Sequence, residues 1–269
     1  MSYSVSGHDI RDVQKAEMEI LLEFDRVCKL HSIPYILFTG TMLGAVRHNG
    51  FIPWDDDIDV AMAREDYRRF VTACHQDLGD GYFLQDHESD PYYRENIAKV
   101  RKDGTVFQEA RYEGLPMHQG VFIDIFPLDS LHGNRLVDTL HSQSVFLISL
   151  IRASINAVKM LDRGRRGRIR GLLNRVEKSV QRAQVRYMGI FNGHRTEHLV
   201  PFGLCRHQWR RYRIRRDDLV DTVTLDFEGH GFPVPRGYDR VLRDAYGDYM
   251  ELPAPEERVP KHAPVRIEL

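Results

Sequence analysis

The sequence is poor in cysteine and has no long hydrophobic run. Its 269 residues include three cysteines, Cys28, Cys74 and Cys205, which lie far apart and form no CxxC pair. This sparse, odd set argues against a disulfide framework or a structural zinc site, and it indicates reduced thiols in a cytoplasmic setting. The most apolar run, Val145 to Ile151, covers about a third of a bilayer span, and the N-terminus becomes charged before any apolar stretch of signal-peptide length. We therefore expect a cytoplasmic protein, with contact to the inner face of a membrane left open.

The chain also lacks an excess of charge of either sign. Its 38 Lys and Arg stand against 39 Asp and Glu, a formal net charge of -1, which excludes a globally basic nucleic-acid binder. Hydrophobic residues (42%) and charged residues (29%) are in ordinary globular proportion, which argues against disorder and against a fibrous protein. The length suits one large domain or a core with an added lobe.

Hydrophobic periodicity predicts a mixed α/β core flanked by helices. Longer helices are expected over residues 9–30, 64–78 and 238–246, the first capped by Ser6 followed by Asp9. A short helix is expected from Gly40 to Asn49. Strands are expected at residues 35–38, 57–62, 82–85, 97–101 and 121–126, the last of which ends at Pro127.

Positive charge is concentrated in the second half of the chain, where the pattern from residue 131 to about 187 is helical. Residues 162–186 carry eight Arg and one Lys against two acidic residues, and residues 206–216 carry six Arg. A solvated helix face, a surface for anionic lipid or a phosphate-rich acceptor, and nucleic-acid binding are the three interpretations. The net charge favours the second over the third. We divide the chain into a catalytic core (1–130), a basic helical lobe (131–216) and a segment returning to the core (217–269).

Four carboxylates lie within the five residues from Asp55 to Asp59. On a strand, Asp57 and Asp59 share a face, where they repel each other unless a cation lies between them. Oxygen ligands favour Mg²⁺ or Mn²⁺ over zinc. An acidic surface turn is the alternative. Apolar residues on both sides indicate a buried strand, in which carboxylates need compensation, so a metal site is favoured.

Asp124 is a further acidic position, inside the apolar run Val121 to Phe126. A lone carboxylate in such a strand is costly unless it is paired or bound to metal. An Asp bonded to nearby backbone or to an arginine is the alternative. Together with Asp57 and Asp59, Asp124 is better explained as a third ligand, because three carboxylates can hold two ions for in-line displacement at phosphorus.

Phosphate-binding residues are expected on both sides of the acidic segment. Gly40 and Thr41 precede a short helix, where backbone N–H groups, a hydroxyl and the positive helix end can meet a phosphate; an ordinary turn is the alternative. Arg47, at the far end of that helix, is either a phosphate contact or solvated. Lys99 and Arg101 lie two apart on a strand and share a face. They either neutralise charge on a transferring phosphate or form a solvated cationic edge.

The segment from Thr39 to Val60, TGTMLGAVRHNGFIPWDDDIDV, resembles the signature of the LicD family. That family comprises phosphocholine and related phosphotransferases with a nucleotidyltransferase-like fold, and fukutin-type sugar-modifying transferases belong to the wider group. Three further stretches are similar to it, namely KVR at 99–101, GVFIDIFP at 120–127 and YGDYM at 246–250. The resemblance covers residues 10–130 and about 230–255, and it is loose from 131 to 228.

The resemblance implies that Asp57, Asp59 and Asp124 bind metal and that Gly40 and Thr41 contact the donor phosphates. It also implies a CDP-activated donor such as CDP-choline and a glycan, lipid-linked glycan or teichoic-acid-like acceptor. We therefore expect metal-dependent transfer of a phospho-alcohol group, first of all phosphocholine, to a glycan hydroxyl. Transfer of glycerol phosphate, ribitol phosphate or a nucleotide is the alternative among enzymes. A nucleic-acid-binding or scaffold protein with a vestigial metal site is the alternative outside them, and no nucleic-acid partner is expected.

Two features of the site stay open in the sequence. The base that deprotonates the acceptor is one of Asp59, Asp124, His48, His118 and His262. A quaternary ammonium group needs an aromatic or acidic box, for which the candidate aromatics are Trp54, Tyr92, Tyr93, Tyr112 and Trp209. Scattered aromatics are more often part of a core.

Overall fold

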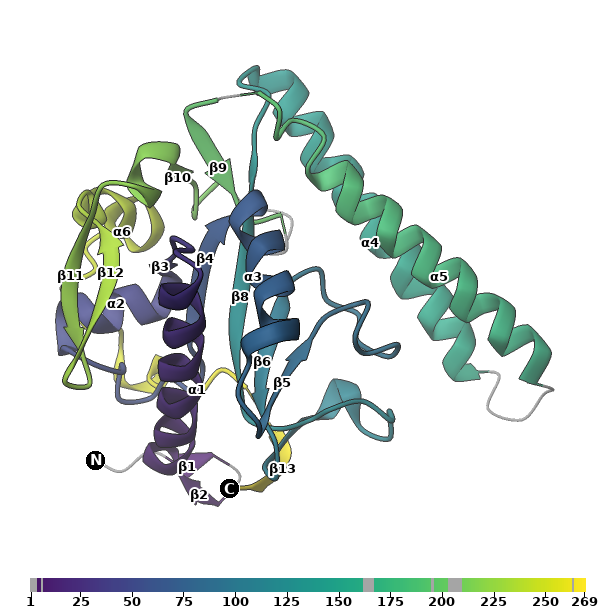
Figure 1. The fold of residues 1–269 in the computed structure, drawn as a ribbon, viewed down its shortest axis with the longest axis horizontal. Coiled ribbons are helices and arrows are strands. Elements are labelled where there is room, and N and C mark those ends of the chain that lie inside the picture. Colours follow the sequence, from purple (N-terminus) through teal and green to yellow (C-terminus); the bar gives the residue numbers. More distant parts are fainter. Residues whose placement is uncertain (1–3, 6, 162–166, 195, 203–209, 263) are drawn as a thin grey trace.

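A single mixed sheet lies at the centre of the protein, and helices α1 (Ile10–Leu30) and α3 (Arg64–Asp77) cover one of its faces (Figure 1). The structure is a computed structural model and describes residues 4–5, 7–161, 167–194, 196–202, 210–262 and 264–269. The structure does not describe the side chains of Cys205, Trp209 and the five arginines between residues 163 and 170. Cys28 and Cys74 are buried free thiols.

The central sheet combines antiparallel pairs with one parallel pair, β4 with β8. Along its path lie β10 (Ile214–Arg215), β9 (His198–Val200), β8 (Phe122–Ser130), β4 (Asp59–Ala63) and β3 (Ile36–Leu37), with β6 (Ala98–Lys102) and β5 (Tyr82–Gln85) branching from β8. The predicted mixed α/β class is confirmed. The two short strands β9 and β10 were not predicted, and the division into three segments stays a prediction.

Two strand boundaries differ from the prediction. β4 begins at Asp59, so Asp57 precedes the strand instead of lying on it. β8 continues through Pro127 to Ser130, although the sequence predicts its end at that proline. The reason is the pairing: β6 pairs with β8 only up to Ile125 and β9 only from Asp129. Pro127 therefore falls in a gap on that edge, where a missing N–H leaves no ladder bond unmade.

Helix α1 shows how the local sequence builds the layer under the sheet. Asp9 is its N-cap, and its carboxylate accepts a hydrogen bond from the Arg11 backbone N–H at 2.9 Å. Val13, Ile20 and Phe24 follow at helical spacing and are fully buried against the sheet. Because α1 and α3 occupy one face, the alternate residues of β4, β6 and β8 point to the other face.

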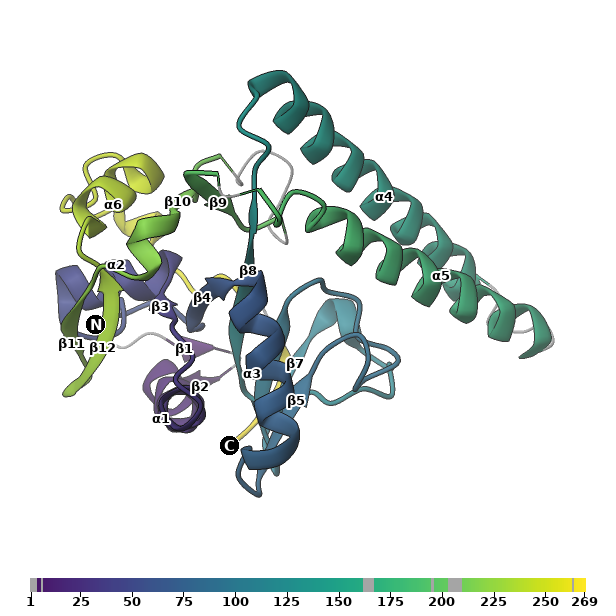
Figure 2. The same cartoon turned by 45° about the horizontal axis from the view of Figure 1, so that its top comes forward.

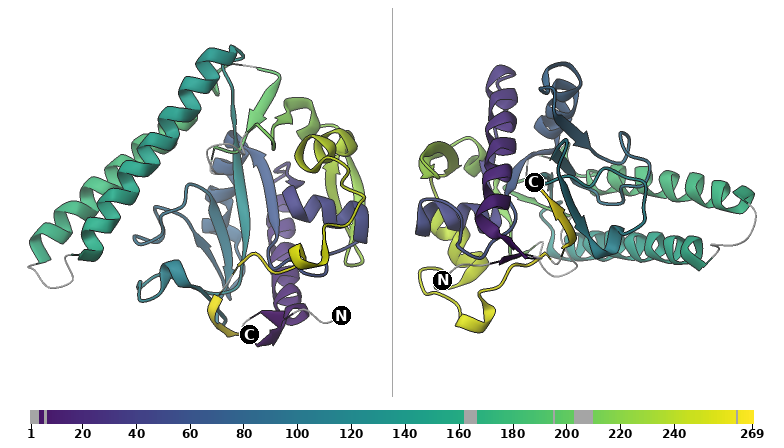
Figure 3. Two further views of the ribbon diagram at one scale, coloured as in Figure 1. Left: turned by 180° about the vertical axis from the view of Figure 1, so that it is seen from behind. Right: turned by 90° about the horizontal axis from the view of Figure 1, so that it is seen from below.

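That other face is crossed by the end of the chain. In Figure 3 (left) the C-terminal segment runs over the sheet on the side away from α1, and it ends in β13 (Pro264–Glu268), which pairs with β7 (Val106–Glu109). The His262 ring lies 5.8 Å from the ring of Phe122 on β8. Residues far apart in the sequence therefore meet on this face.

The remaining elements flank the sheet. Helix α2 (Thr39–His48), helix α6 (Tyr238–Tyr246) and the hairpin β11 (Thr222–Phe227) and β12 (His230–Pro235) pack beside β3. The described short elements are β1 (Ser4–Val5), β2 (His8–Asp9) and the 3-10 turns Ala110–Tyr112, Arg216–Leu219 and Pro255–Glu257. The predicted helices near residues 40 and 238 are confirmed; the β11–β12 hairpin was not predicted.

Two long helices, α4 (Arg135–Leu161) and α5 (Gly167–Met188), form an antiparallel hairpin that projects away from the sheet (Figures 1 and 2). At its base, the Arg64 guanidinium bonds both oxygens of Asp129 on β8, and Asn192, just after α5, donates to the same carboxylate at 2.7 Å. Across the described helices, none has the length and apolar character needed to cross a membrane.

Candidate active site

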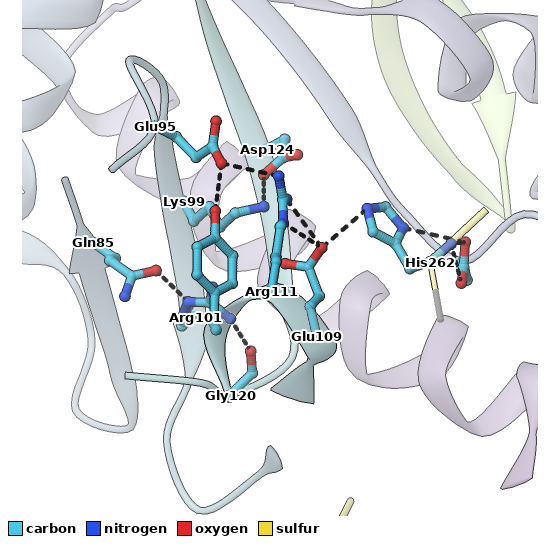
Figure 4. A network of polar contacts seen from close by, with 11 residues as sticks. Gln85, Glu95, Lys99, Arg101, Glu109, Arg111, Gly120, Asp124 and His262 are labelled. Atoms are coloured by element: carbon cyan, nitrogen blue, oxygen red, sulfur yellow. Dashed lines mark hydrogen bonds and ion pairs between the residues drawn. The ribbon is translucent and has the colours of Figure 1, made fainter. Parts of the chain in front are cut away.

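A row of polar side chains runs across three strands on the face away from α1. Asp59 of β4 is the direct partner of Asp124 of β8 in the parallel ladder, and Asp124 is the direct partner of Lys99 of β6 in the antiparallel one. Directly paired residues point to the same face of a sheet, so the three side chains lie side by side. The Lys99 ammonium donates to an Asp124 oxygen (Figure 4).

Asp57 stands next to this row, in the loop before β4. One oxygen from each of Asp55, Asp56 and Asp57 lies within 4.8 Å of the others. The charge of Asp57 contributes to raising the pKa values of both Asp59 and Asp124. Asp57 and Asp59 are half-buried, whereas Asp55 and Asp56 are buried. The carboxylates that keep access to solvent are therefore Asp57 and Asp59, with Asp124 8% exposed.

Asp55 and Asp56 are held by other parts of the chain. Asp56 accepts hydrogen bonds from the backbone N–H groups of Lys261 (3.1 Å) and His262 (3.2 Å), and its carboxylate also contacts the His262 ring at 3.3 Å. The Lys261 ammonium lies 3.5 Å from Asp55. On the α1 side, the Gln14 amide donates to the Asp55 carbonyl at 2.8 Å. These two aspartates therefore fasten the acidic loop to the C-terminal segment and to α1.

The start of α2 is built around the same carboxylates. A Cβ atom on Gly40 would lie 2.7 Å from an Asp55 oxygen, so a side chain there has no room. The Thr41 hydroxyl accepts the Asp59 backbone N–H at 2.8 Å, and Thr39 donates its hydroxyl to the Asp59 carboxylate. Thr39 has φ +42°, a left-handed conformation that costs about 1–2 kcal/mol for a residue with a side chain. Local strain is thus stored beside Asp59.

Lys99 and Arg101 are interior residues. Both are at most 1% exposed, which contradicts the alternative of a solvated cationic edge. Arg101 donates to Gln85 and to the Gly120 carbonyl, both at 2.5 Å, and both cations lie over the Phe122 ring. Lys99 therefore belongs to the row that it forms with Asp59 and Asp124, called the acidic row from here on, and Arg101 lies two residues further along β6 on the same face.

Arg47 is placed differently from the other predicted residues. Its guanidinium donates to the carbonyls of Tyr249 (2.7 Å) and Glu251 (3.3 Å), so it ties the C-terminal end of α2 to the segment after α6. Gly40 and Thr41 lie at the opposite end of that helix. A direct contact of Arg47 with the donor stays a prediction.

Electrostatics in the site favour proton or cation binding. Burial raises the pKa of Asp59 well above its usual range, and the charges of Asp57 and Asp124 add to that shift. Burial also raises the pKa of Asp124 and lowers that of Lys99, while the ion pair between them opposes both shifts. Burial raises the pKa of Asp55 to about 7. Crowded carboxylates of this kind are stabilised by a cation.

Two functional candidates were missed by the sequence analysis. Glu17 on α1 is 2% exposed, and its Oε2 atom has no hydrogen-bond partner among the described residues. Burial raises its pKa well above the usual range, and the charges of Asp57 and Asp56 act in the same direction. The available signal was its position among Val13, Ile20 and Phe24 on the apolar stripe of the helix. Lys261, the second candidate, carries no local signal.

The histidines and aromatic residues that the sequence suggested as a base or as a choline box lie in different places in the structure. His262 bridges Asp56 and, at 4.0 Å, Glu109 on β7 (Figure 4). His118 contacts Asp103, and His48 contacts Arg47. Trp54 lies under Arg258, and Tyr112 lies against Arg111 and Glu95. Tyr93 is buried and Tyr92 is half-buried. An aromatic box for choline stays a prediction.

The donor set fits a hard divalent cation. Asp57, Asp59 and Asp124 offer only oxygen atoms and keep a partly open side, and the charge of Asp57 adds to the raised pKa values of Asp59 and Asp124; such ligands suit Mg²⁺ or Mn²⁺. A cation there would polarise a phosphoryl oxygen and offset charge on a transferring phosphate. Lys99 lies beyond Asp124 in the same row and adds a fixed positive charge.

Known proteins resemble this chain in the region of the site. Residues 32–146, which contain the whole acidic row, match the family model described as LicD/FKTN/FKRP, nucleotidyltransferase domain. The class that the fold and site define is therefore a nucleotidyltransferase-domain enzyme. Over 94% of its length the chain is 30% identical to the lipopolysaccharide cholinephosphotransferase LicD of Haemophilus influenzae, covering 96% of that protein. The chain thus belongs to the LicD family of phosphotransferases, and the predicted resemblance is confirmed.

Shorter similarities involve two uncharacterized Rickettsia proteins. One, from Rickettsia typhi, is 42% identical over 55 residues, and the other, from Rickettsia prowazekii, is 53% identical over 36 residues. These matches cover 20% and 13% of this chain, and 18% and 14% of the two proteins. They therefore add a local likeness alone.

Proposed function

We propose that this protein transfers phosphocholine from CDP-choline to a hydroxyl group of a lipopolysaccharide-type glycan, in a reaction that depends on Mg²⁺ or Mn²⁺. The observation that carries the proposal is the row Asp59, Asp124 and Lys99 across three strands, with Asp57 beside it. The full-length similarity to a lipopolysaccharide cholinephosphotransferase supports the choice of donor and acceptor. The scarcity of cysteine favours a cytoplasmic setting.

The residues of the site have different roles in the proposed phosphoryl transfer. Asp57, Asp59 and Asp124 would hold the divalent cations, two in the full arrangement, and these cations would offset charge on the transferring phosphate. Gly40, which lacks a side chain, lies against the Asp55 carboxylate at the N-terminal end of α2, and the backbone N–H groups at that helix end favour an anion. Lys99 and Arg101 keep the floor of the site positive.

The transfer itself is an in-line displacement. The acceptor hydroxyl oxygen attacks the phosphorus that carries choline, the bond from that phosphorus to the bridging oxygen breaks, and CMP leaves with the electron pair. The hydroxyl proton passes to a carboxylate of the acidic row, for which Asp59 and Asp124 are the candidates. Lys261 and His262 hold the acidic loop in place from the C-terminal segment.

The test uses the full-length protein with labelled CDP-choline and lipopolysaccharide that lacks choline. Label should move to the glycan, with one CMP released per transfer, only when Mg²⁺ or Mn²⁺ is present. Asp59→Asn and Asp124→Asn should each lower kcat at least about a hundredfold. The control, Asp226→Asn, changes an exposed carboxylate of β11 and should leave kcat unchanged. Calorimetry with Mn²⁺ checks metal binding separately from turnover.

The outcomes separate the alternatives. CMP release with CDP-glycerol or CDP-ribitol but not CDP-choline would replace the head group, and pyrophosphate release from a nucleotide would indicate nucleotidyl transfer. Full CMP release by the Asp59 variant would refute the assigned site. Absence of Mn²⁺ binding together with salt-dependent RNA binding would favour a nucleic-acid-binding protein.

A further inference from the structure

In the projecting α4–α5 hairpin, helix α4 buries its polar side and exposes its apolar side. The side of α4 that packs against α5 and the body of the protein is polar, with Asp138, His141, Arg152 and Asn156 all at most 8% exposed. Arg152 forms a buried ion pair with Glu177 of α5 at 3.2 Å and donates to Gln184 at 2.8 Å. A helix on a water-soluble surface ordinarily buries its apolar side and exposes its polar side.

The outward side of α4 is apolar instead. Its large exposed side chains are aliphatic and recur every four or seven residues, namely Leu136 (68% exposed), Leu140 (57%), Leu147 (58%), Ile151 (48%) and Val158 (51%), with Leu150 (47%) beside them. Between residues 139 and 158 the only charged residue is the buried Arg152. An apolar stripe about 30 Å long, without charge, therefore faces away from the protein.

The rest of the hairpin is strongly basic. Residues 135–188 hold twelve Lys and Arg against three Asp and Glu, a formal charge of +9 in a chain whose total is -1. Two of the three acidic residues are described, Asp138 and Glu177, and both are buried. Arg175 and Arg186 of α5 are exposed. The described surface of the hairpin thus combines an aliphatic stripe with positive charge.

We propose that the α4–α5 hairpin is a membrane-contact element, in which the aliphatic stripe of α4 enters the interface of an anionic lipid bilayer and the arginines of α5 meet lipid phosphates. An apolar helix face flanked by cationic side chains is the pattern that binds such interfaces. The charge argues against a second copy of this chain as the occupant, because two hairpins of +9 would repel each other. Helices that pair with each other also carry complementary charges beside the apolar seam, whereas Gln143, Ser144 and Ser154 beside this stripe are uncharged.

The test measures partition of the full-length protein onto vesicles of phosphatidylcholine with and without phosphatidylglycerol. The wild type should sediment with the anionic vesicles, and high salt should weaken its binding. The double substitution Leu147→Glu and Ile151→Glu should lower the partition coefficient at least about tenfold. The matched control carries Leu30→Glu and Val220→Glu, which place the same charge at exposed aliphatic residues (58% and 83%) outside the hairpin. Circular dichroism confirms that both variants are folded.

Three results would overturn the proposal. The first is equal partition of the stripe variant and its control. The second is no binding of the wild type to anionic vesicles. The third is a concentration-dependent dimer in sedimentation equilibrium that only the stripe variant loses, without vesicle binding, because it would assign the stripe to a second copy. Arg175→Glu with Arg186→Glu should weaken binding to anionic vesicles while leaving binding to neutral vesicles unchanged.

Discussion

Arg64 and Asp129 form an ion pair in the interior, where the base of the α4–α5 hairpin joins the sheet. The side chains are 5% and 0% exposed, and the guanidinium bonds both carboxylate oxygens, at 2.8 and 2.5 Å. Asn192 adds a third bond to Asp129 at 2.7 Å and accepts the Ser130 N–H at 2.6 Å. We predict that Arg64→Met strongly destabilises the protein, because it leaves the Asp129 charge buried and without its cation.

The magnitude follows from burial. Removing one partner of a buried pair costs about 3–5 kcal/mol, because the remaining charge keeps its desolvation penalty. Asp129→Asn should cost a similar amount by stranding Arg64. The double variant removes both charges and keeps an oxygen for Asn192, so its loss should be only about 1–2 kcal/mol. The two single losses therefore should not add.

The assay is urea unfolding followed by circular dichroism for the wild type, both single variants and the double variant, with unchanged m-values as the check on two-state behaviour. Lys15→Met is the control, because the Lys15–Asp12 pair on α1 is 71% and 53% exposed and should contribute less than about 1 kcal/mol. The reasoning is refuted if Arg64→Met costs no more than Lys15→Met, or if the double loss equals the sum of the single losses.

Two further predictions concern the acidic loop and the glycines. A Cβ on Gly44 would lie 2.4 Å from the Gly50 carbonyl oxygen, so Gly44→Ala should lower the free energy of unfolding in urea by at least about 2 kcal/mol. Gly171 on α5 faces open space, so the control Gly171→Ala should raise the free energy of unfolding by about 0.5–1 kcal/mol. Equal effects of the two substitutions would contradict this prediction. Burial opposes a charged His262 ring, but the bond to Asp56 and the charge of Asp57 outweigh it and raise the pKa of His262 to about 9. Because the folded value exceeds the unfolded value of about 6.5, the resulting stability, up to about 3 kcal/mol, is complete below pH 6.5 and is lost as the pH rises to 9. Urea unfolding in chelator should show this loss in the wild type and not in His262→Gln.

Local patterns in the sequence determined much of the fold. The 3.6-residue period of Val13, Ile20 and Phe24 predicted α1, and helices near residues 40, 64 and 238 were found where apolar spacing placed them. Strands with weak or no period were missed, namely β7, β9 to β12 and β13. Their partners lie far away in the chain, as in the pairing of β13 with β7, and no local pattern contains that information. The predicted end of β8 at Pro127 was wrong for the same reason. A proline in a strand costs a ladder hydrogen bond only where a neighbouring strand would accept an N–H at that position, and the sequence does not show which neighbour lies at that edge.

The candidate site divides in a similar way. The sequence by itself singled out Asp57, Asp59 and Asp124 as candidate site residues, because carboxylates among apolar residues need compensation wherever the chain folds. Only the tertiary structure decided their relation: the parallel register sets Asp59 beside Asp124, and the antiparallel register sets Lys99 beyond it. It also brought Lys261 to Asp55 and turned the apolar side of α4 outward. Composition and periodicity show which residues need a partner or a buried environment, whereas strand register and helix packing decide which distant residue supplies it.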